Sequence, residues 1–202
     1  MDANVSLVEA ASELSEAGFD QFLTSDLAKD IPIVGTAIKI CTAIDNIRNR
    51  LYAAKLRAFI SELENIPADK KESFRRKIAA DSKQFDKLGE NILLLLERTS
   101  DVEKPAYLAS VFLAYLDGII DRSTLRRLWE AIADAFVDDL TDLLIYVPQT
   151  QPAEFLRHLS KTGLTKIESG KTWDDLGDLY FIVSELGADF IRAHREVKKR
   201  YG

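Results

Sequence analysis

The segment from Ile31 to Leu63 constrains the fold most, because it is the longest helix-compatible stretch in the N-terminal half of the chain. Its apolar residues recur mostly at gaps of three and four, which places their side chains on one face of an α-helix. These residues are Ile33, Ala37, Ile40, Cys41, Ile44, Ile47, Leu51, Ala54, Leu56, Phe59, Ile60 and Leu63. A helix of this length with one apolar stripe needs several other helices to cover it. The segment therefore predicts the central helix of a helical bundle.

The first part of this segment, residues 31–44, is almost uncharged and also admits a membrane-acting interpretation. We prefer burial in the protein core to a membrane contact, because Lys39 lies within this stretch and the charged residues Asp45 and Arg48 follow it closely. Whether Gly35 packs within one chain or against a second copy stays open. No apolar run reaches the ~20 residues that a bilayer requires, and the N-terminus lacks the pattern of a targeting signal. With a single cysteine in the chain, these features predict a soluble, cytoplasmic protein.

Helical periodicity continues on both sides of the long segment. Residues 5–17 and 20–29 predict two short helices, and Asn65-Ile-Pro67 ends the long one. Residues 69–99 predict two helices that meet near residues 81–85. The first is anchored by Phe74 and Ile78. The second has an inner face of Leu88, Ile92, Leu95 and Leu96.

Two further helices follow. Residues 106–118 are nearly all apolar and predict a central helix after Pro105. Ser123 is a good N-cap for one helix that runs to about Val147 and ends at residues 148–152. Its predicted inner face consists of Leu125, Leu128, Trp129, Ile132, Phe136, Leu140, Leu143 and Leu144.

The last fifty residues have a different organisation. A short helix over residues 153–162 precedes two predicted strands, in GLTKIES and LYFIVS, which a polar loop joins. Ser184 caps a final helix. This order of helix, hairpin and helix is also found in winged-helix tails. The predicted fold is mainly α, with a helical bundle over residues 1–150 and a helix-hairpin-helix subdomain over residues 151–202.

Common catalytic and cofactor patterns are missing from the sequence. It contains none of the glycine-rich nucleotide loops, zinc-protease motifs or serine-hydrolase motifs. The two histidines, His158 and His194, are predicted to lie on the surface, and Cys41 is predicted to be an inert core thiol. The sequence therefore assigns no catalytic residue and no cofactor.

One carboxylate cluster remains as a candidate metal site. Glu130, Asp134 and Asp138 are four residues apart on the predicted helix, and Asp139 and Asp142 lie beside them. Oxygen ligands of this kind suit Mg²⁺ or Ca²⁺. A solvated helix face is the preferred interpretation, because no partner ligand motif occurs elsewhere. No metal ligand is assigned.

Nucleic acid is the alternative partner. The net charge of −6 argues against a role in coating nucleic acid, because phosphate affinity depends on clustered Lys and Arg. If the hairpin were a wing, four basic residues would lie near a DNA backbone: Arg157, Lys161, Lys166 and Lys171. Acidic neighbours would repel phosphate there: Glu168, Asp174, Asp175 and Asp178.

Two segments carry a family resemblance. They are PIVGTAIKICTAIDNIRNRLYAAKLRAFISEL and DVEKPAYLASVFLAYLDGII, and the ending from GLT to SELGADFI is similar in pattern. Together they resemble small helical proteins of bacteria and phages, some of the Abi-alpha-like kind linked to phage defence. The resemblance implies a helical fold and a defence-related role. It supplies no catalytic residues.

The preferred functional prediction is a non-enzymatic cytoplasmic interaction protein that acts through a helical surface, binding a protein partner or a second copy of itself. A winged-helix DNA-binding regulator is the first alternative. A membrane-acting defence effector using residues 31–44 is the second.

Overall fold

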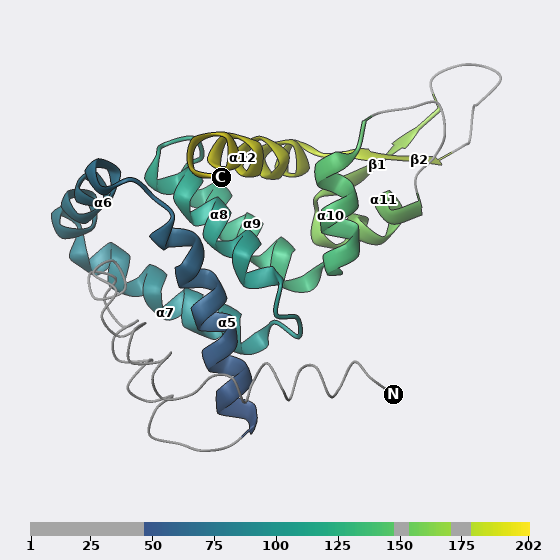
Figure 1. Cartoon of the computed structure of the whole chain (residues 1–202). Helices are drawn as coiled ribbons and strands as arrows, with labels where there is room; N and C mark the ends of the chain where they lie inside the picture. Colours follow the sequence, from purple (N-terminus) through teal and green to yellow (C-terminus); the bar gives the residue numbers. More distant parts are fainter. Residues whose placement is uncertain (1–46, 148–153, 171–178) are drawn as a thin grey trace. The chain divides into compact units, whose positions relative to one another are not determined.

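The computed structural model describes residues 47–147, 154–170 and 179–202 (Figure 1). Within these ranges the chain forms eight α-helices, one 3-10 helix and a two-stranded antiparallel sheet near the C-terminus. The predicted fold class, mainly α with a small C-terminal hairpin, is confirmed. The predictions for residues 5–17, 20–29, 31–46 and 148–152, including those for Gly35 and Cys41, lie outside the described residues.

The chain divides into two compact units, the first ending at Ala106 and the second running from Tyr107 to Gly202. The boundary that the sequence predicts near residue 150 stays a prediction. In the structure, helix α12 (Glu185–Tyr201) packs against α9 (Arg122–Asp134) and α10 (Val137–Ile145). These contacts group the C-terminal residues with the helices that precede position 150.

The first unit contains helices α5 (Ile47–Glu64), α6 (Ala68–Ala80) and α7 (Ser82–Arg98). Helix α5 ends at Glu64, directly before the predicted stop at Pro67. The prediction of two helices over residues 69–99 is confirmed, with the break at Asp81. The Asp81 carboxylate caps α7 by accepting a hydrogen bond of 3.2 Å from the backbone N–H of Gln84.

The inner face of α5 packs against α7. The buried residues of α5 follow one helical line, with gaps of three and four: Ala53, Leu56, Ile60 and Leu63, with Phe59 beside them. Leu51 does not lie on this line and is 41% exposed, so its predicted place in the core stripe is wrong. The anchors predicted for α6 and α7 are buried as expected: Phe74, Ile78, Leu88, Ile92, Leu95 and Leu96.

A cation from α5 stabilises the C-terminal end of α7. The amine of Lys55 donates hydrogen bonds to the carbonyl of Leu96, at 3.2 Å, and to the carbonyl of Thr99. The last carbonyls of a helix lack partners in the helix itself and carry partial negative charge, so an ammonium group is favourable there. Burial of the amine lowers the pKa of Lys55.

The core of the second unit forms around α8 (Lys104–Leu116), in which every residue from Leu108 to Leu116 is buried. Trp129 of α9 packs on this helix. Its ring stacks on Phe112 with the centroids 6.0 Å apart, and its indole N–H donates to the carbonyl of Leu108 at 3.1 Å. Helix α12 contributes three more buried apolar side chains: Phe190, Ala193 and Val197. The prediction that α8 is central is therefore correct.

The N-cap of α9 is Asp121, so the prediction of Ser123 was wrong. The Asp121 carboxylate accepts hydrogen bonds from the backbone N–H of Thr124, at 2.7 Å, and from the Ser123 hydroxyl, at 3.0 Å. These hydrogen bonds lower the pKa of Asp121, and the bond from Thr124 has the largest effect. Asp121 takes the cap because it has extended backbone geometry and stands three residues before Thr124, whereas Ser123 is already inside the helix.

The single helix predicted over residues 123–147 is also wrong, because the chain breaks between α9 and α10. Ala135 and Phe136 adopt extended backbone geometry there. Without proline or glycine at these positions, the break comes from packing: the change of direction lets α10 bury Leu140 and Leu143 against α11 and α12. Phe136 is 76% exposed as a result and does not belong to the predicted inner face.

The C-terminal elements follow the predicted order. They are α11 (Glu154–His158), the 3-10 helix η1 (Leu159–Thr162), β1 (Thr165–Ser169), β2 (Leu179–Val183) and α12. The strands pair with Thr165 opposite Val183 and Ser169 opposite Leu179. Gly163, at φ 80°, ends η1 in the left-handed conformation that favours glycine.

The base of the hairpin is joined closely to the start of α12. Ser184 caps the helix as predicted: its hydroxyl accepts a hydrogen bond of 3.0 Å from the backbone N–H of Gly187 and donates one of 2.6 Å to the carbonyl of Gly163. A Cβ at Gly187 would lie 2.1 Å from the carbonyl oxygen of Leu164, so only glycine permits this approach. The junction fixes where Val183 lies relative to α12.

We expect Trp129→Ala to destabilise the second unit by about 3–5 kcal/mol, because it removes a buried ring and the stacking on α8. Phe136→Ala, which removes an aromatic ring from the solvent-exposed break, should change the free energy of unfolding by less than about 0.5 kcal/mol. Urea denaturation measures both. Equal losses for the two variants would contradict the assignment of Trp129 to the core and Phe136 to the surface.

Candidate interaction surface

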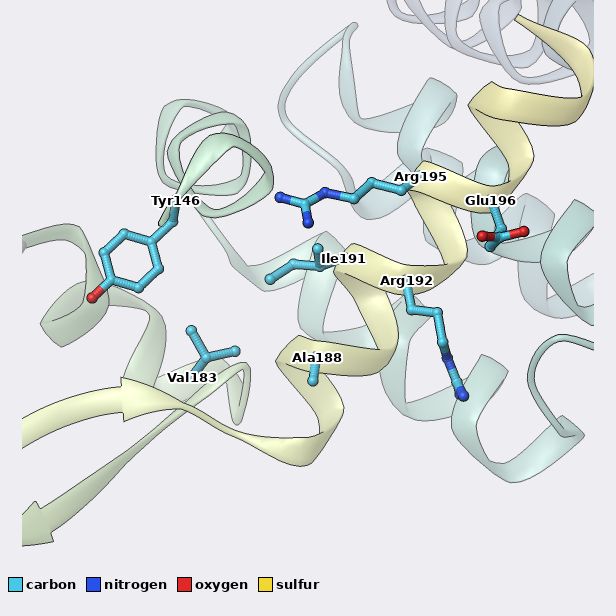
Figure 2. Close-up of a pocket in the computed structure, with 7 residues that line it drawn as sticks. All are labelled: Tyr146, Val183, Ala188, Ile191, Arg192, Arg195 and Glu196. Carbon is cyan, nitrogen blue, oxygen red and sulfur yellow. The ribbon is translucent and has the colours of Figure 1, made fainter. Parts of the chain in front are cut away.

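A surface pocket of about 480 Å³ lies in the second unit, where the C-terminal end of α10, the end of β2 and one face of α12 meet (Figure 2). It is lined by Tyr146, Val183, Ala188, Ile191, Arg192, Arg195 and Glu196. Four of these are apolar or aromatic, and the other three are charged. The pocket thus combines an apolar lining with charge at its edge, which is the usual composition of a binding site.

Local structure explains why these residues converge. On α12, positions 188, 191, 192, 195 and 196 recur with helical spacing and line the pocket, whereas Phe190, Ala193 and Val197 are buried on another face. Val183 is the last residue of β2, directly before the Ser184 cap. Tyr146 follows the last residue of α10, and its ring meets Phe155 edge-on with a centroid distance of 5.5 Å.

The charged side chains of the pocket differ in what they bind. Arg192 forms an ion pair of 2.6 Å with Asp189, and Glu196 forms one of 3.6 Å with Arg200. Arg195 instead donates a hydrogen bond of 3.0 Å to the backbone carbonyl of Leu144, in the last turn of α10. In Figure 2, Arg195 and Ile191 extend from α12 toward α10 and Tyr146, whereas Arg192 points the other way. Arg195 is therefore the pocket cation that is directed toward α10.

More apolar surface is exposed beside the pocket. Ile145 and Val147 flank the pocket residue Tyr146 in the chain and are 72% and 63% exposed. Large apolar side chains are exposed on the hairpin as well: Ile167, Leu179 and Tyr180. Exposed apolar side chains beside a concave site, such as Ile145 and Val147, are typical of a surface that binds another molecule.

The acidic residues proposed as metal candidates do not form the predicted stripe. Glu130 and Asp134 are exposed on α9, whereas Asp138 lies on α10, beyond the break. Asp142 is exposed, and the buried Asp139 lies 3.4 Å from the Nδ1 atom of His158. Throughout the described ranges, no three acidic, histidine or cysteine side chains are grouped so that they could hold a metal ion.

The basic residues of the DNA-binding alternative lie on consecutive elements. Arg157 is exposed on α11, Lys161 on η1 and Lys166 on β1. Helix α11 packs against η1, and η1 packs against β1. Lys171 and the acidic residues at 174, 175 and 178 lie outside the described residues.

His194 is half-buried, so the prediction that it lies on the surface was wrong, whereas His158 is exposed as predicted. The ring of His194 packs against Tyr107 and Phe190, with centroid distances of 5.7 and 6.4 Å, and its Nδ1 atom is buried without a hydrogen-bond partner. Burial lowers the pKa of His194, and the positive charge of Lys198 lowers it further. The folded protein therefore favours the uncharged ring.

This shift predicts a loss of stability in acid. Below the ordinary pKa of 6.5 the unfolded chain binds a proton at His194 that the folded protein resists, so stability falls as the pH drops from 6.5 toward the lower folded pKa. His194→Phe, which keeps a ring between Tyr107 and Phe190, should reduce the drop in melting temperature between about pH 7.5 and about pH 5.5. Thermal melts measure this. An unchanged drop in the variant would show that His194 is not responsible.

Sequence reasoning missed the pocket. Arg192 and Arg195 belong, with Lys198, Lys199 and Arg200, to a basic group that complements the carboxyl end of the last helix, and the sequence alone gives them no other role. The sequence did contain one signal for the pocket. A second stripe of side chains on α12 runs from Ala188 and Ile191 to Arg195, outside the buried face of the helix. The contributions of Tyr146 and Val183 carried no local signal, because tertiary packing alone brings them to this helix.

Comparisons of the chain with protein-family models, with curated proteins and with solved structures find no match. Across the described helices, none is both long enough and apolar enough to span a membrane.

Proposed function

We propose that this protein is a non-enzymatic interaction protein, which binds another polypeptide through the pocket formed by α10, β2 and α12. The observation that carries the proposal is the pocket itself, whose lining combines the apolar and aromatic residues Tyr146, Val183, Ala188 and Ile191 with Arg195. Apolar and aromatic anchors with arginine are the composition in which protein interfaces are enriched.

The chemistry of the pocket lining supports binding rather than catalysis. Its one carboxylate, Glu196, is paired with Arg200, and its described lining residues include no serine, cysteine or histidine. A nucleophile beside a base is therefore missing from this surface. We propose the cytoplasm as the location, which the single cysteine favours. On the basis of the resemblance to Abi-alpha-like proteins, we propose phage defence as the setting.

Site-specific crosslinking tests the proposal. With the photo-reactive residue p-benzoylphenylalanine at position 191, in the pocket, we expect a covalent adduct with another polypeptide in the native cell. An adduct of twice the chain mass would identify a second copy as the partner. The same residue at Arg126, exposed on α9, should give no adduct above background.

A second variant makes the test specific to the pocket. Ala188→Trp should abolish the adduct at position 191, because the larger side chain fills the space that Ala188 leaves. Ala79→Trp, at an exposed position on α6, should leave the adduct at position 191 unchanged. Adducts that form equally at positions 191 and 126, or that survive Ala188→Trp, would contradict the proposal.

Duplex DNA is a second candidate partner, favoured by the exposed cations Arg157, Lys161 and Lys166. Arg157 and Lys161 form no ion pair with a carboxylate of the described chain. The anionic side chains of Glu154 and Glu168 on the same elements oppose this candidate, which is why it ranks second.

Fluorescence anisotropy with a labelled duplex tests it. If DNA is the partner, binding should weaken steeply as salt is raised, and the double variant Arg157→Gln, Lys161→Gln should bind less tightly because phosphate contacts are lost. Glu130→Gln serves as a control for a charge change elsewhere on the second unit. The absence of binding at about 50 mM salt would exclude this candidate, because low salt favours phosphate contacts.

A further inference from the structure

We infer that the occupant of the pocket is an acidic segment of a partner polypeptide, in which an apolar side chain lies next to Asp or Glu. This inference rests on the proposed function, because it specifies the chemistry of the partner that the same pocket binds.

The apolar part of the occupant follows from the pocket lining. Val183 comes from β2, Ile191 and the small residue Ala188 come from α12, and Tyr146 directly follows α10. The volume of about 480 Å³ lies within the range of ~300–1,000 Å³ that is typical of ligand pockets. An apolar side chain placed there would remove its own surface and that of the lining from water.

The acidic part of the occupant follows from Arg195. The carboxylates of Asp189 and Glu196 already pair with Arg192 and Arg200, and Asp117 also pairs with Arg200, at 3.0 Å. Arg195 is bound only to a neutral carbonyl, so its positive charge is not balanced by a carboxylate within the described chain. A guanidinium group has several N–H donors in a planar fork, and the bond to Leu144 uses one of them. The others can bind a carboxylate.

The charge around the pocket also favours a negatively charged partner. Between Ala188 and Arg200, helix α12 carries five cationic side chains and two anionic ones, although the whole chain has a net charge of −6. An incoming acidic segment is therefore attracted to this helix, and a basic one is repelled from it. Apolar and cationic groups in one pocket point to a single occupant that is both apolar and acidic.

An unbiased peptide selection tests the inference. The probe is a display library of random peptides about a dozen residues long, selected on the full chain and counter-selected on the Ala188→Trp variant. We expect the enriched peptides to be acidic, with Asp or Glu next to an aromatic or aliphatic residue. For the best of them, Arg195→Gln should weaken binding about tenfold or more, because it removes the charge but keeps an N–H donor for Leu144.

Matched variants separate charge from folding. Arg195→Lys keeps the positive charge but loses the planar fork, so its affinity should lie between those of the wild type and Arg195→Gln, while Arg126→Gln, a charge loss elsewhere on the unit, should leave affinity unchanged. Thermal melts confirm that each variant is folded.

The outcomes distinguish this inference from the proposed function. Enriched peptides that are neutral or basic, or that bind Arg195→Gln as tightly as the wild type, would overturn the inference and leave the pocket as a binding site. If no peptide is enriched against the Ala188→Trp counter-selection, the proposed function and the inference both fail.

Discussion

The packing of Trp129 on α8 is the interaction on which the rest of the second unit depends. Helix α8 is buried without interruption from Leu108 to Leu116, so it is stable only when other elements cover it. Trp129 covers part of it through stacking on Phe112, and its indole N–H donates a hydrogen bond to the Leu108 carbonyl, so the buried indole is not left without a partner. That contact fixes α9 on α8. Helix α12 in turn packs against α9.

Helix α12 connects this core to the candidate interaction surface. One of its faces is buried through Phe190, Ala193 and Val197, which fixes the rotation of the helix about its axis. That rotation brings Ile191 and Arg195 to the edge where α10 ends, and the hydrogen bond from Arg195 to Leu144 joins the two helices. The close approach of Gly187 to Leu164 fixes the hairpin beside them. The orientation of α12 and its contacts with α10 and the hairpin therefore produce the pocket.

Much of the fold was predictable from local signals. Pro67 and Asp81 mark helix boundaries, Ser184 is a cap, and the apolar run of α8 marks a core helix, because each depends only on backbone chemistry or on side-chain periodicity. The break at Ala135 and Phe136 was not predictable in this way. Both residues are compatible with a helix, and the break accompanies long-range contacts of α10 with α11 and α12 that no local pattern shows. The exposure of Phe136 and the loss of the acidic stripe follow from that one break.

The sequence by itself determined the helical class, the order of the C-terminal elements and the apolar character of α8, since periodicity and capping act over a few residues. Only the tertiary structure decided which of the two pocket arginines of α12 is directed toward α10 and which histidine is half-buried. Arg192 and Arg195 look alike in sequence, but the packing of α10 places a helix end beside one of them and Asp189 pairs with the other. His194 is half-buried because Tyr107 packs against it from a helix far away in the chain.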